Sequence, residues 1–189
     1  SGKRYLDVIR RSTERLHALV EDLLLIAQIE AKRVELDLLP VDVADLARSA
    51  VEAQRPAAEE KGVTVEVVTD HPPIVRADRI RLTQVLDNLV SNAVKFTDEG
   101  GSVLVHLGEN GKGVELVVSD TGIGIPADEQ GQLFSRFFRA STATQHAIPG
   151  TGLGLSISRA LVEQHGGTIS IESSVGEGTQ VTVSIPSTP

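Results

Sequence analysis

Three short elements in the second half of the chain constrain its fold more than any other feature. The first is the segment NLVSNAVKF at residues 88–96, which places two asparagines four residues apart. Two glycine clusters follow, DTGIGIP at residues 120–126 and GTGLGL at residues 150–155. Each element alone is compatible with an ordinary helix, turn or hinge. Together, in this order, they predict a domain built around one bound nucleotide.

The composition allows a sizeable core and excludes several classes of function. Of the 189 residues 40% are hydrophobic and 3% aromatic, so aliphatic side chains must fill that core. The formal net charge is −8 and no basic run occurs, which disfavours nucleic acid and membrane surfaces as partners. Cysteine is absent, which excludes disulfides and thiolate chemistry. No apolar run approaches the roughly 20 residues of a membrane span. Because no initiator Met is present, we expect a segment of a longer protein.

Residues 3–38 have the periodicity of one long helix, which Pro40 should end. A heptad seam repeats at steps of three and four residues, at Leu6, Ile9, Thr13, Leu16, Val20, Leu23 and Ala27. Such a stripe can pack on the helix's own domain or join a bundle. Its breadth favours self-association in a bundle.

Helices and strands alternate over the rest of the chain. Asp42 and Asp78 are placed to cap helices at about 43–61 and 79–96, with Pro56 kinking or interrupting the first. A further helix should run from Gly152 to His165. Strands are expected at 63–68, 102–107, 114–119, 168–173 and 179–185, with a turn at 71–73. This order predicts an α/β (α+β) sandwich, in which helices cover one face of a mixed, mostly antiparallel sheet.

The asparagine segment suits a metal-bound phosphate group. Asn88 and Asn92 share one face of the predicted helix, and Lys95 lies close to that face. Amide oxygens can ligate a hard cation without adding negative charge beside the phosphates, and Lys95 supplies a compact positive charge. A polar helix face that is merely solvated is the alternative.

The two glycine clusters offer a site for a base and a site for an anion. Asp120 ends a predicted strand, where its carboxylate could accept a hydrogen bond from the exocyclic amine of adenine. The glycines that follow allow a flat ligand to approach the backbone. The second cluster enters a helix, whose first N–H groups bind anions, but it lacks the lysine of a P-loop. A turn and a flexible hinge are the respective alternatives.

A phenylalanine- and arginine-bearing segment separates the clusters. The run LFSRFFR at residues 133–139 holds three of the four phenylalanines, which could also form a local hydrophobic plug. Arg136 and Arg139 are the cations best placed to reach a nucleotide's phosphates. Residues 140–149 have the composition of a mobile lid that closes over the ligand.

In this order the elements resemble the ATP-binding catalytic domain of bacterial sensor histidine kinases. The broader group includes Hsp-type chaperones, type II topoisomerases and a mismatch-repair ATPase. The run LLLIAQIE at residues 23–30, followed by Pro40-Val41-Asp42, resembles the second helix of the family's dimerisation and phosphotransfer hairpin. The resemblance implies that residues 1–39 belong to that hairpin and residues 40–189 to the catalytic domain, with an ATP lid at about 127–150.

The same resemblance implies cofactors, partners and a location. ATP and Mg²⁺ would be the cofactors, and the receiver domain of a response regulator would be the partner. The full protein would be a homodimer through its hairpin. This chain would be a cytoplasmic segment, without membrane contact of its own, of a parent anchored in the cell membrane.

A role for each residue of the site also follows from the resemblance. Asn92 would be the Mg²⁺ ligand, and Asn88 would lie beside the phosphates. Lys95 and Arg139 would contact phosphate, and Asp120 would bind the adenine amine. The other residues of the adenine side would be Phe96, Gly122, Gly124, Ile125 and Thr179. The other residues of the phosphate side would be Arg136, Gly150, Thr151, Gly152, Leu153, Gly154 and Leu155.

Two departures from the broader group bear on activity. Hydrolytic members carry Glu where this chain has Asn88, and an amide cannot act as a general base, so we expect ATP to be bound but poorly hydrolysed. None of the five histidines fits the family's phosphoacceptor, which an acidic residue follows; Ala18 follows His17. We therefore expect the acceptor outside this chain, which would not autophosphorylate alone. A nucleotide-holding module without catalysis and a hydrolytic ATPase or Ser kinase are the rival functions.

Overall fold

The computed structural model describes residues 2–31, 33–70 and 74–187. It divides the chain into two compact units, residues 1–35 and 36–189. The turn expected at 71–73 lies outside the described residues. Within the described ranges, no helix is both long and apolar enough to cross a bilayer.

The first unit is dominated by helix α1 (Gly2–Glu30). The expectation of a helix to residue 38 is wrong, because residues 33–38 are not helical and Leu39–Val41 form strand β1. Pro40 favours the strand at Leu39, since the residue before a proline is driven to extended backbone, but the helix ends well before it, at Glu30. Ile9, Leu16, Val20 and Leu23 of the heptad seam are exposed. Self-association through this stripe stays a prediction.

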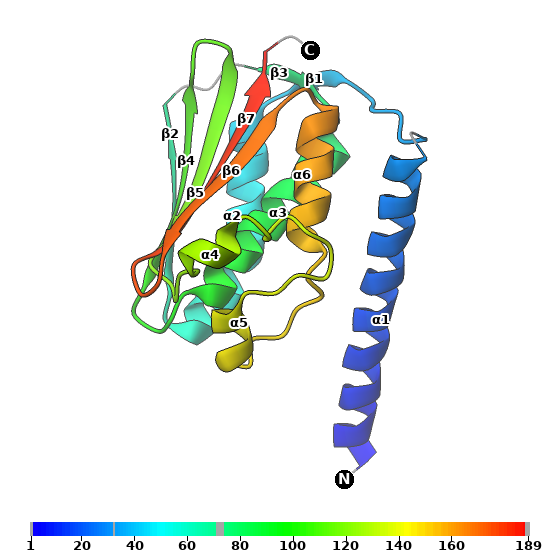
Figure 1. Cartoon of the computed structure of the whole chain (residues 1–189), viewed down its shortest axis with the longest axis vertical. Helices are drawn as coiled ribbons and strands as arrows, with labels where there is room; N and C mark the ends of the chain where they lie inside the picture. Colours follow the sequence, from blue (N-terminus) through cyan, green and yellow to red (C-terminus); the bar gives the residue numbers. More distant parts are fainter. Residues whose placement is uncertain (1, 32, 71–73, 188–189) are drawn as a thin grey trace. The chain divides into compact units, whose positions relative to one another are not determined.

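The second unit contains a five-stranded sheet in the order β2-β4-β5-β7-β6 (Figure 1). Its strands are β2 (Thr64–Thr69), β4 (Ser102–Glu109), β5 (Gly113–Asp120), β6 (Thr168–Ser174) and β7 (Gly178–Pro186). Only the β2–β4 pair among them is parallel. The expected mixed, mostly antiparallel sheet is confirmed, with strand ends shifted by at most two residues.

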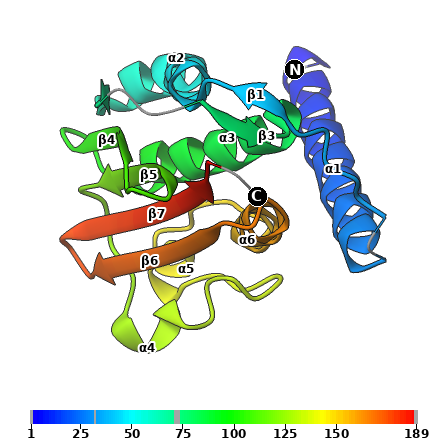
Figure 2. The same cartoon turned by 90° about the horizontal axis from the view of Figure 1, so that it is seen from above.

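Three helices cover one face of this sheet: α2 (Val43–Lys61), α3 (Arg79–Phe96) and α6 (Gly154–Gln164) (Figures 1 and 2). The strands alternate as a half-covered sheet requires. In β4, for example, Val103, Val105 and Leu107 are buried, whereas Leu104 is partly exposed. The expected α+β sandwich is therefore confirmed, and its aliphatic core fixes α3 and α6 on the sheet.

The helix caps follow the sequence closely, but two boundaries differ. Asp42 accepts hydrogen bonds from the N–H groups of Ala44 and Asp45, as the capping pattern predicted. The interruption expected at Pro56 is wrong, since α2 runs through it to Lys61. Pro56 is exposed, so water can bond the carbonyl that the proline leaves unpaired. Helix α6 starts at Gly154 rather than Gly152, whose φ of +73° is left-handed and cannot belong to the helix.

Two features of the second unit were not predicted from the sequence. A separate two-stranded sheet pairs β1 with β3 (Val75–Ala77), with Leu39 opposite Ala77. Within the expected lid lie two short helices, α4 (Ala127–Gln130) and α5 (Ser141–Gln145). Strands of three residues and helices of one turn are too short to establish a period.

Candidate functional site

The asparagine face of α3 meets the N-terminus of α6. Asn88 Nδ2 donates to Ser158 Oγ at 2.9 Å, and Asn92 Nδ2 donates to Asn88 Oδ1 at 3.3 Å. Ser158 is only 1% exposed, so this contact belongs to the helix interface. A Cβ added at Gly154 would lie 2.1 Å from Asn88 Oδ1. Only glycine therefore allows α6 to begin this close to the amide.

The first turn of α6 presents N–H groups that no side chain caps. Leu153, at the N-cap position, makes no capping hydrogen bond, and its own N–H donates to Thr151 Oγ1 at 3.2 Å. Leu153 is fully buried and anchors the turn in the core. The following Leu155 is half-buried. Uncapped N–H groups carry partial positive charge, so this turn favours a negatively charged ligand.

Asp120 lies at the end of β5, in a setting made largely of backbone. Gly122 N–H donates to Asp120 Oδ1 at 2.9 Å, and Thr179 on β7 is its register partner. Burial raises the pKa of the Asp120 carboxyl to about 6, although the backbone N–H groups of Gly122 and Thr179 lower it. For this carboxylate the cost of burying its charge exceeds the stabilisation by its hydrogen bonds. A further hydrogen-bond donor would therefore stabilise its ionised form.

The first glycine cluster is fixed between α3 and β6. Ile123 N–H donates to the carbonyl of Phe96 at 3.1 Å, and Ile125 N–H donates to Ser173 Oγ at 2.9 Å. A Cβ added at Gly122 would lie 2.3 Å from the Phe96 carbonyl oxygen. The Gly124 carbonyl accepts a hydrogen bond from Thr142 in the lid, at 3.0 Å. This end of the site is therefore rigid and has backbone on most sides.

The second cluster packs on the phenylalanine segment. Phe137 N–H donates to the Gly152 carbonyl at 2.9 Å. Phe137 has a φ of +61° and its ring is 60% exposed. Phe134 instead lies under the Arg159 guanidinium, 5.5 Å from the ring centroid. The expected hydrophobic plug thus accounts for Phe134 better than for Phe137.

Internal hydrogen bonds hold the lid segment together. Ser141 N–H donates to Glu129 Oε2 at 2.8 Å, and Arg139 donates to the carbonyl of Ile148. Arg136 and Arg139 are both exposed. Arg139 therefore lies within the segment expected to form the lid and bonds a backbone carbonyl of the same segment.

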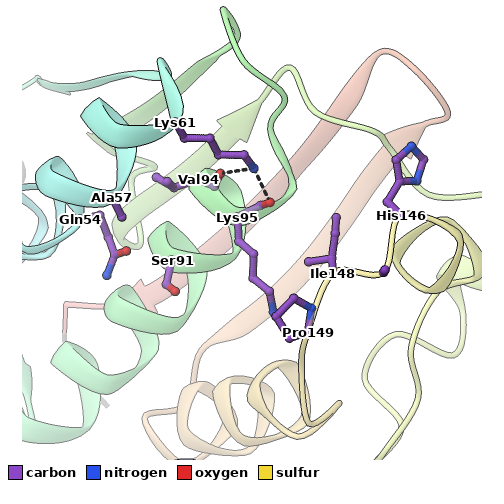
Figure 3. A pocket seen from close by; sticks show the side chains of 10 residues that line it. Gln54, Ala57, Lys61, Ser91, Val94, Lys95, His146, Ile148 and Pro149 are labelled. Carbon is purple, nitrogen blue, oxygen red and sulfur yellow. Dashed lines mark hydrogen bonds between the residues drawn. The ribbon is translucent and has the colours of Figure 1, made fainter. Parts of the chain in front are cut away.

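A cavity of about 470 Å³ lies beside α3, between the C-terminal half of α2 and the end of the lid (Figure 3). Lys95 extends across it towards Pro149, and a Cβ added at Gly150 would lie 3.2 Å from Lys95 Nζ. The same ammonium is 5.1 Å from the ring centroid of Phe96. On the opposite wall Lys61 Nζ donates to the carbonyls of Val94 and Lys95, at 3.2 and 2.6 Å.

The geometry brings the predicted residues together in two groups. Asn88, Asn92 and Gly154 form one, with Lys95 reaching Gly150 nearby. Asp120, Gly122, Gly124, Ile125, Thr179 and the Phe96 backbone form the other. Sequence reasoning missed Ser158, Ser173 and Lys61, which hold these groups in place. Their partners are 70, 48 and 33 to 34 residues away in the chain, so no local pattern identifies them.

The donor set suits Mg²⁺ held jointly with phosphate. Asn92 bonds Asn88 through its Nδ2 group, so the contact between the two asparagines does not use the neutral Asn92 Oδ1, which is the atom that could ligate a metal. The same residues contain no cluster of three histidine, aspartate or glutamate side chains that could hold a metal alone. Mg²⁺ commonly takes few protein oxygens and completes its shell with phosphate and water. The residues therefore fit a nucleotide-dependent Mg²⁺ site.

Comparison with known proteins identifies the family of the chain. Residues 77–189 match the family described as histidine kinase-, DNA gyrase B-, and HSP90-like ATPase. The circadian input-output histidine kinase CikA of Synechococcus elongatus is 40% identical over 97% of the chain and 25% of its own length. The sensor histidine kinase WalK of Bacillus subtilis is 33% identical over 97% of the chain and 30% of its own length.

Two solved structures have a similar fold. Full-length ShkA in complex with AMPPNP superposes with a TM-score of 0.84, at 35% identity over 97% of this chain and 38% of that one. The histidine kinase ThkA in complex with the response regulator protein TrrA gives 0.77, at 28% identity over 100% and 52%. The chain belongs to the histidine kinase-, DNA gyrase B- and HSP90-like ATPase family, as the catalytic ATP-binding domain of a sensor histidine kinase. It spans about a quarter to a third of the curated relatives named above.

Proposed function

We propose that this chain binds ATP with Mg²⁺ and, in the longer protein, transfers the γ-phosphoryl group to a histidine outside this chain. The observation that carries the proposal is the Asn88 amide, which donates to Ser158 and lies against Gly154. A group at this position that cannot take a proton from water leaves ATP intact for a better nucleophile. The geometry therefore favours phosphoryl transfer over hydrolysis.

Adenine recognition would occur at the rigid end of the site. The Asp120 carboxylate would accept a hydrogen bond from the exocyclic amine, which compensates for its burial. Gly122 and Gly124 would let the base approach the backbone, with Ile125, Thr179 and Phe96 around it. Because guanine has a carbonyl oxygen where adenine has the amine, the same carboxylate would repel it.

The phosphates would lie between α3 and the first turn of α6. Asn92 would ligate Mg²⁺, which neutralises phosphate charge when bound, and Asn88 would orient the phosphates beside it. Lys95 would contact phosphate, with Arg139 and Arg136 approaching from the lid. Positioning and charge stabilisation supply most of the catalysis in phosphoryl transfer. The backbone groups that follow the phosphates would come from Gly150, Thr151, Gly152, Leu153, Gly154 and Leu155.

The same proposal assigns the chain's other parts. Residues 1–39 would belong to the dimerisation and phosphotransfer hairpin of a homodimer, and residues 40–189 would form the catalytic domain. The lid at about 127–150 would close over bound ATP. A response regulator aspartate would then receive the phosphoryl group, as the complex of ThkA with TrrA supports. The longer protein would be anchored in the cell membrane, with this part in the cytoplasm.

Labelled ATP tests the proposal directly. The chain is mixed with Mg²⁺, [γ-³²P]ATP and the separately produced phosphotransfer hairpin of a matching sensor kinase. We expect acid-labile, base-stable label on the hairpin and none on this chain alone. Steady-state phosphate release should stay far below the transfer rate. Bound ATP without phosphohistidine, or rapid phosphate release, would contradict the kinase assignment.

A further inference from the structure

A buried hydrogen-bond cluster joins the N-terminus of α3 to the C-terminal end of α6. His165 is 3% exposed and Asp78 is 9% exposed. The backbone N–H of Asp78 donates to His165 Nε2 at 3.0 Å, and His165 Nδ1 donates to the Leu161 carbonyl at 2.8 Å. Neither residue belongs to the ATP site described above, so the cluster needs a separate explanation.

The two partners of His165 fix its tautomer. A backbone N–H can only donate a hydrogen bond and a carbonyl can only accept one. Nε2 must therefore carry the lone pair and Nδ1 the hydrogen, which makes the ring neutral in this structure. A single neutral imidazole thus bonds one backbone group at the start of α3 and one of α6. The Leu161 carbonyl also accepts from the backbone N–H of His165 at 3.2 Å, so an aliphatic side chain here would remove the partner of the Asp78 N–H only.

The carboxylate of Asp78 extends the cluster to a third segment. Its Oδ1 accepts from Arg81 N–H at 3.1 Å, which caps α3, and its Oδ2 accepts from Asp37 N–H at 3.2 Å. Arg76 also donates to the Leu38 carbonyl at 2.8 Å. Residues 36–38, the segment through which the chain enters this unit from α1, are therefore bonded to the same cap that holds α6.

The helices joined by this cluster carry opposite sides of the nucleotide site. Helix α3 carries Asn88 and Asn92, and the first residue of α6 is Gly154, which lies against Asn88. His165 follows Gly154 by 11 positions, or about 16 Å along a helix at 1.5 Å per residue. A small rotation of α6 about its C-terminal end would therefore move Gly154 relative to the asparagines.

We infer that Asp78 and His165 form a positioning pair, which sets the spacing of the nucleotide site and makes that spacing depend on residues 36–38. This inference rests on the proposed function, because the spacing matters only if nucleotide binds between α3 and α6. It extends that function, because the conformation of the segment that leads to α1 would then affect nucleotide affinity. Displacement of Asp37 would break its hydrogen bond to Asp78 Oδ2. The position of Asp78 would then be less fixed, and α6, which bonds Asp78 through His165, would shift.

Affinity for AMPPNP with Mg²⁺, measured by calorimetry on the whole chain, tests the pair. His165→Phe keeps a ring but removes both hydrogen bonds, and we expect a 3- to 10-fold rise in Kd. His165→Gln keeps an acceptor for the Asp78 N–H and should stay within twofold of wild type. Asp37→Pro removes the N–H that reaches Asp78, and should raise Kd two- to fivefold without touching either helix.

A matched core variant separates positioning from a general loss of stability. Val105→Ala truncates a buried side chain of β4, away from α6, and should leave Kd within twofold at a temperature where all variants are folded. The inference is overturned if His165→Phe binds as wild type does, or if Val105→Ala weakens binding equally.

Hydrogen exchange provides a readout without nucleotide. His165→Phe should lower the protection of the Asp78 amide and of amides in the second turn of α6, near Ser158. Unchanged protection in α6 would overturn the inference even if the wild-type chain bound no nucleotide. Failure of wild-type binding would by itself contradict only the proposed function.

Discussion

The two ends of the proposed nucleotide site differ in the groups that form them. Around Asp120 the neighbours are mostly backbone, including Gly122 N–H and the strand partner Thr179, with the Phe96 carbonyl against Gly122. Around Asn92 and Lys95 the neighbours are side chains and a loop. A backbone site holds its shape before the ligand arrives, whereas a site of long side chains is completed by the ligand. The base end should therefore tolerate less change than the phosphate end.

The largest contrast should come from the same substitution at both ends. In Gly122→Ala the new Cβ would lie 2.3 Å from the Phe96 carbonyl oxygen, a backbone atom at the end of α3 that cannot move aside as a side chain can. We expect a loss of about 2–4 kcal/mol in unfolding free energy and no measurable nucleotide binding. In Gly150→Ala the nearest atom is the flexible tip of Lys95, at 3.2 Å, and the expected loss is below about 0.5 kcal/mol. Urea unfolding of both variants checks this, and equal losses would break the comparison.

Removal of the proposed Mg²⁺ ligand, Asn92, should weaken nucleotide binding somewhat less than Gly122→Ala does, and the loss should depend on Mg²⁺. Asn92→Ala should weaken ATP binding about 30-fold with Mg²⁺ present, equivalent to roughly 2 kcal/mol. With EDTA in place of Mg²⁺, the variant and wild type should bind alike. Ser91→Ala, on the cavity wall next to Asn92, is the control and should change little in either condition. A Mg²⁺-independent loss in Asn92→Ala would contradict the assigned ligand.

The substitution Asp120→Asn tests the Asp120 end of the site through the pH dependence of protein stability. The pKa of this carboxyl is about 6 in the folded protein and near 3.8 when the chain unfolds. Between these values the folded protein keeps a proton that the unfolded chain has lost, so the contribution of Asp120 to stability falls as pH rises through 4 to 6. Above pH 6 the ionised carboxylate costs a constant amount, of about 1–2 kcal/mol after allowance for partial exposure.

The substitution should therefore raise the melting temperature at pH 8 and change it little at pH 4. The gain should be accompanied by reduced preference for ATP over GTP, because the asparagine amide can face either base. Thermal unfolding at both pH values and competition calorimetry measure these effects. A variant less stable than wild type at pH 8 would contradict the assignment of burial as the dominant cause.

The smallest expected change in nucleotide affinity among these tests concerns Lys61, whose ammonium bonds the C-terminal end of α3. Lys61→Met removes the ammonium that donates to the carbonyls of Val94 and Lys95. We expect a loss of about 1 kcal/mol in unfolding free energy and less than a threefold change in ATP affinity. Lys112→Met, in the exposed β4–β5 turn, is the matched control and should be neutral. A larger effect on affinity than on stability would place Lys61 among the ligand contacts instead.

Sequence reasoning succeeded where the signal is local. Asp42 and Asp78 cap the helices they were expected to cap, because a capping side chain bonds N–H groups two or three residues away. Alternation of apolar residues located the five strands of the main sheet, since the covered face repeats every second residue. The order of the expected helices and strands predicted the α+β fold that positions the site.

Sequence reasoning failed where the partner of a residue lies far away in the chain, or where an element is too short to show a period. Strand β1 exists because it pairs with β3, about 36 residues further along the chain. Ser158 supports Asn88 from another helix, and His165 bonds Asp78 across 87 residues. Pro56 was expected to kink or interrupt α2, and it does not interrupt it, because the buried face of that helix and the caps at both of its ends outweigh one missing hydrogen bond. The position of a ligand likewise depends on several segments that are distant in the chain. The proposed ligand contacts therefore stay predictions.

The position of the lid in the chain has a consequence for how the protein can vary. Strand β5 ends at Asp120 and its partner β7 begins at Gly178, so residues 127–150 form an excursion that the β5–β7 pairing closes as a loop. The entropy cost of closing a loop grows only with the logarithm of its length, at about 0.6 kcal/mol for each doubling. Lengthening the segment between α5 and the second glycine cluster would therefore cost little folding free energy. The length of this segment, which we propose as the lid, can thus be changed by selection or engineering almost independently of the sheet.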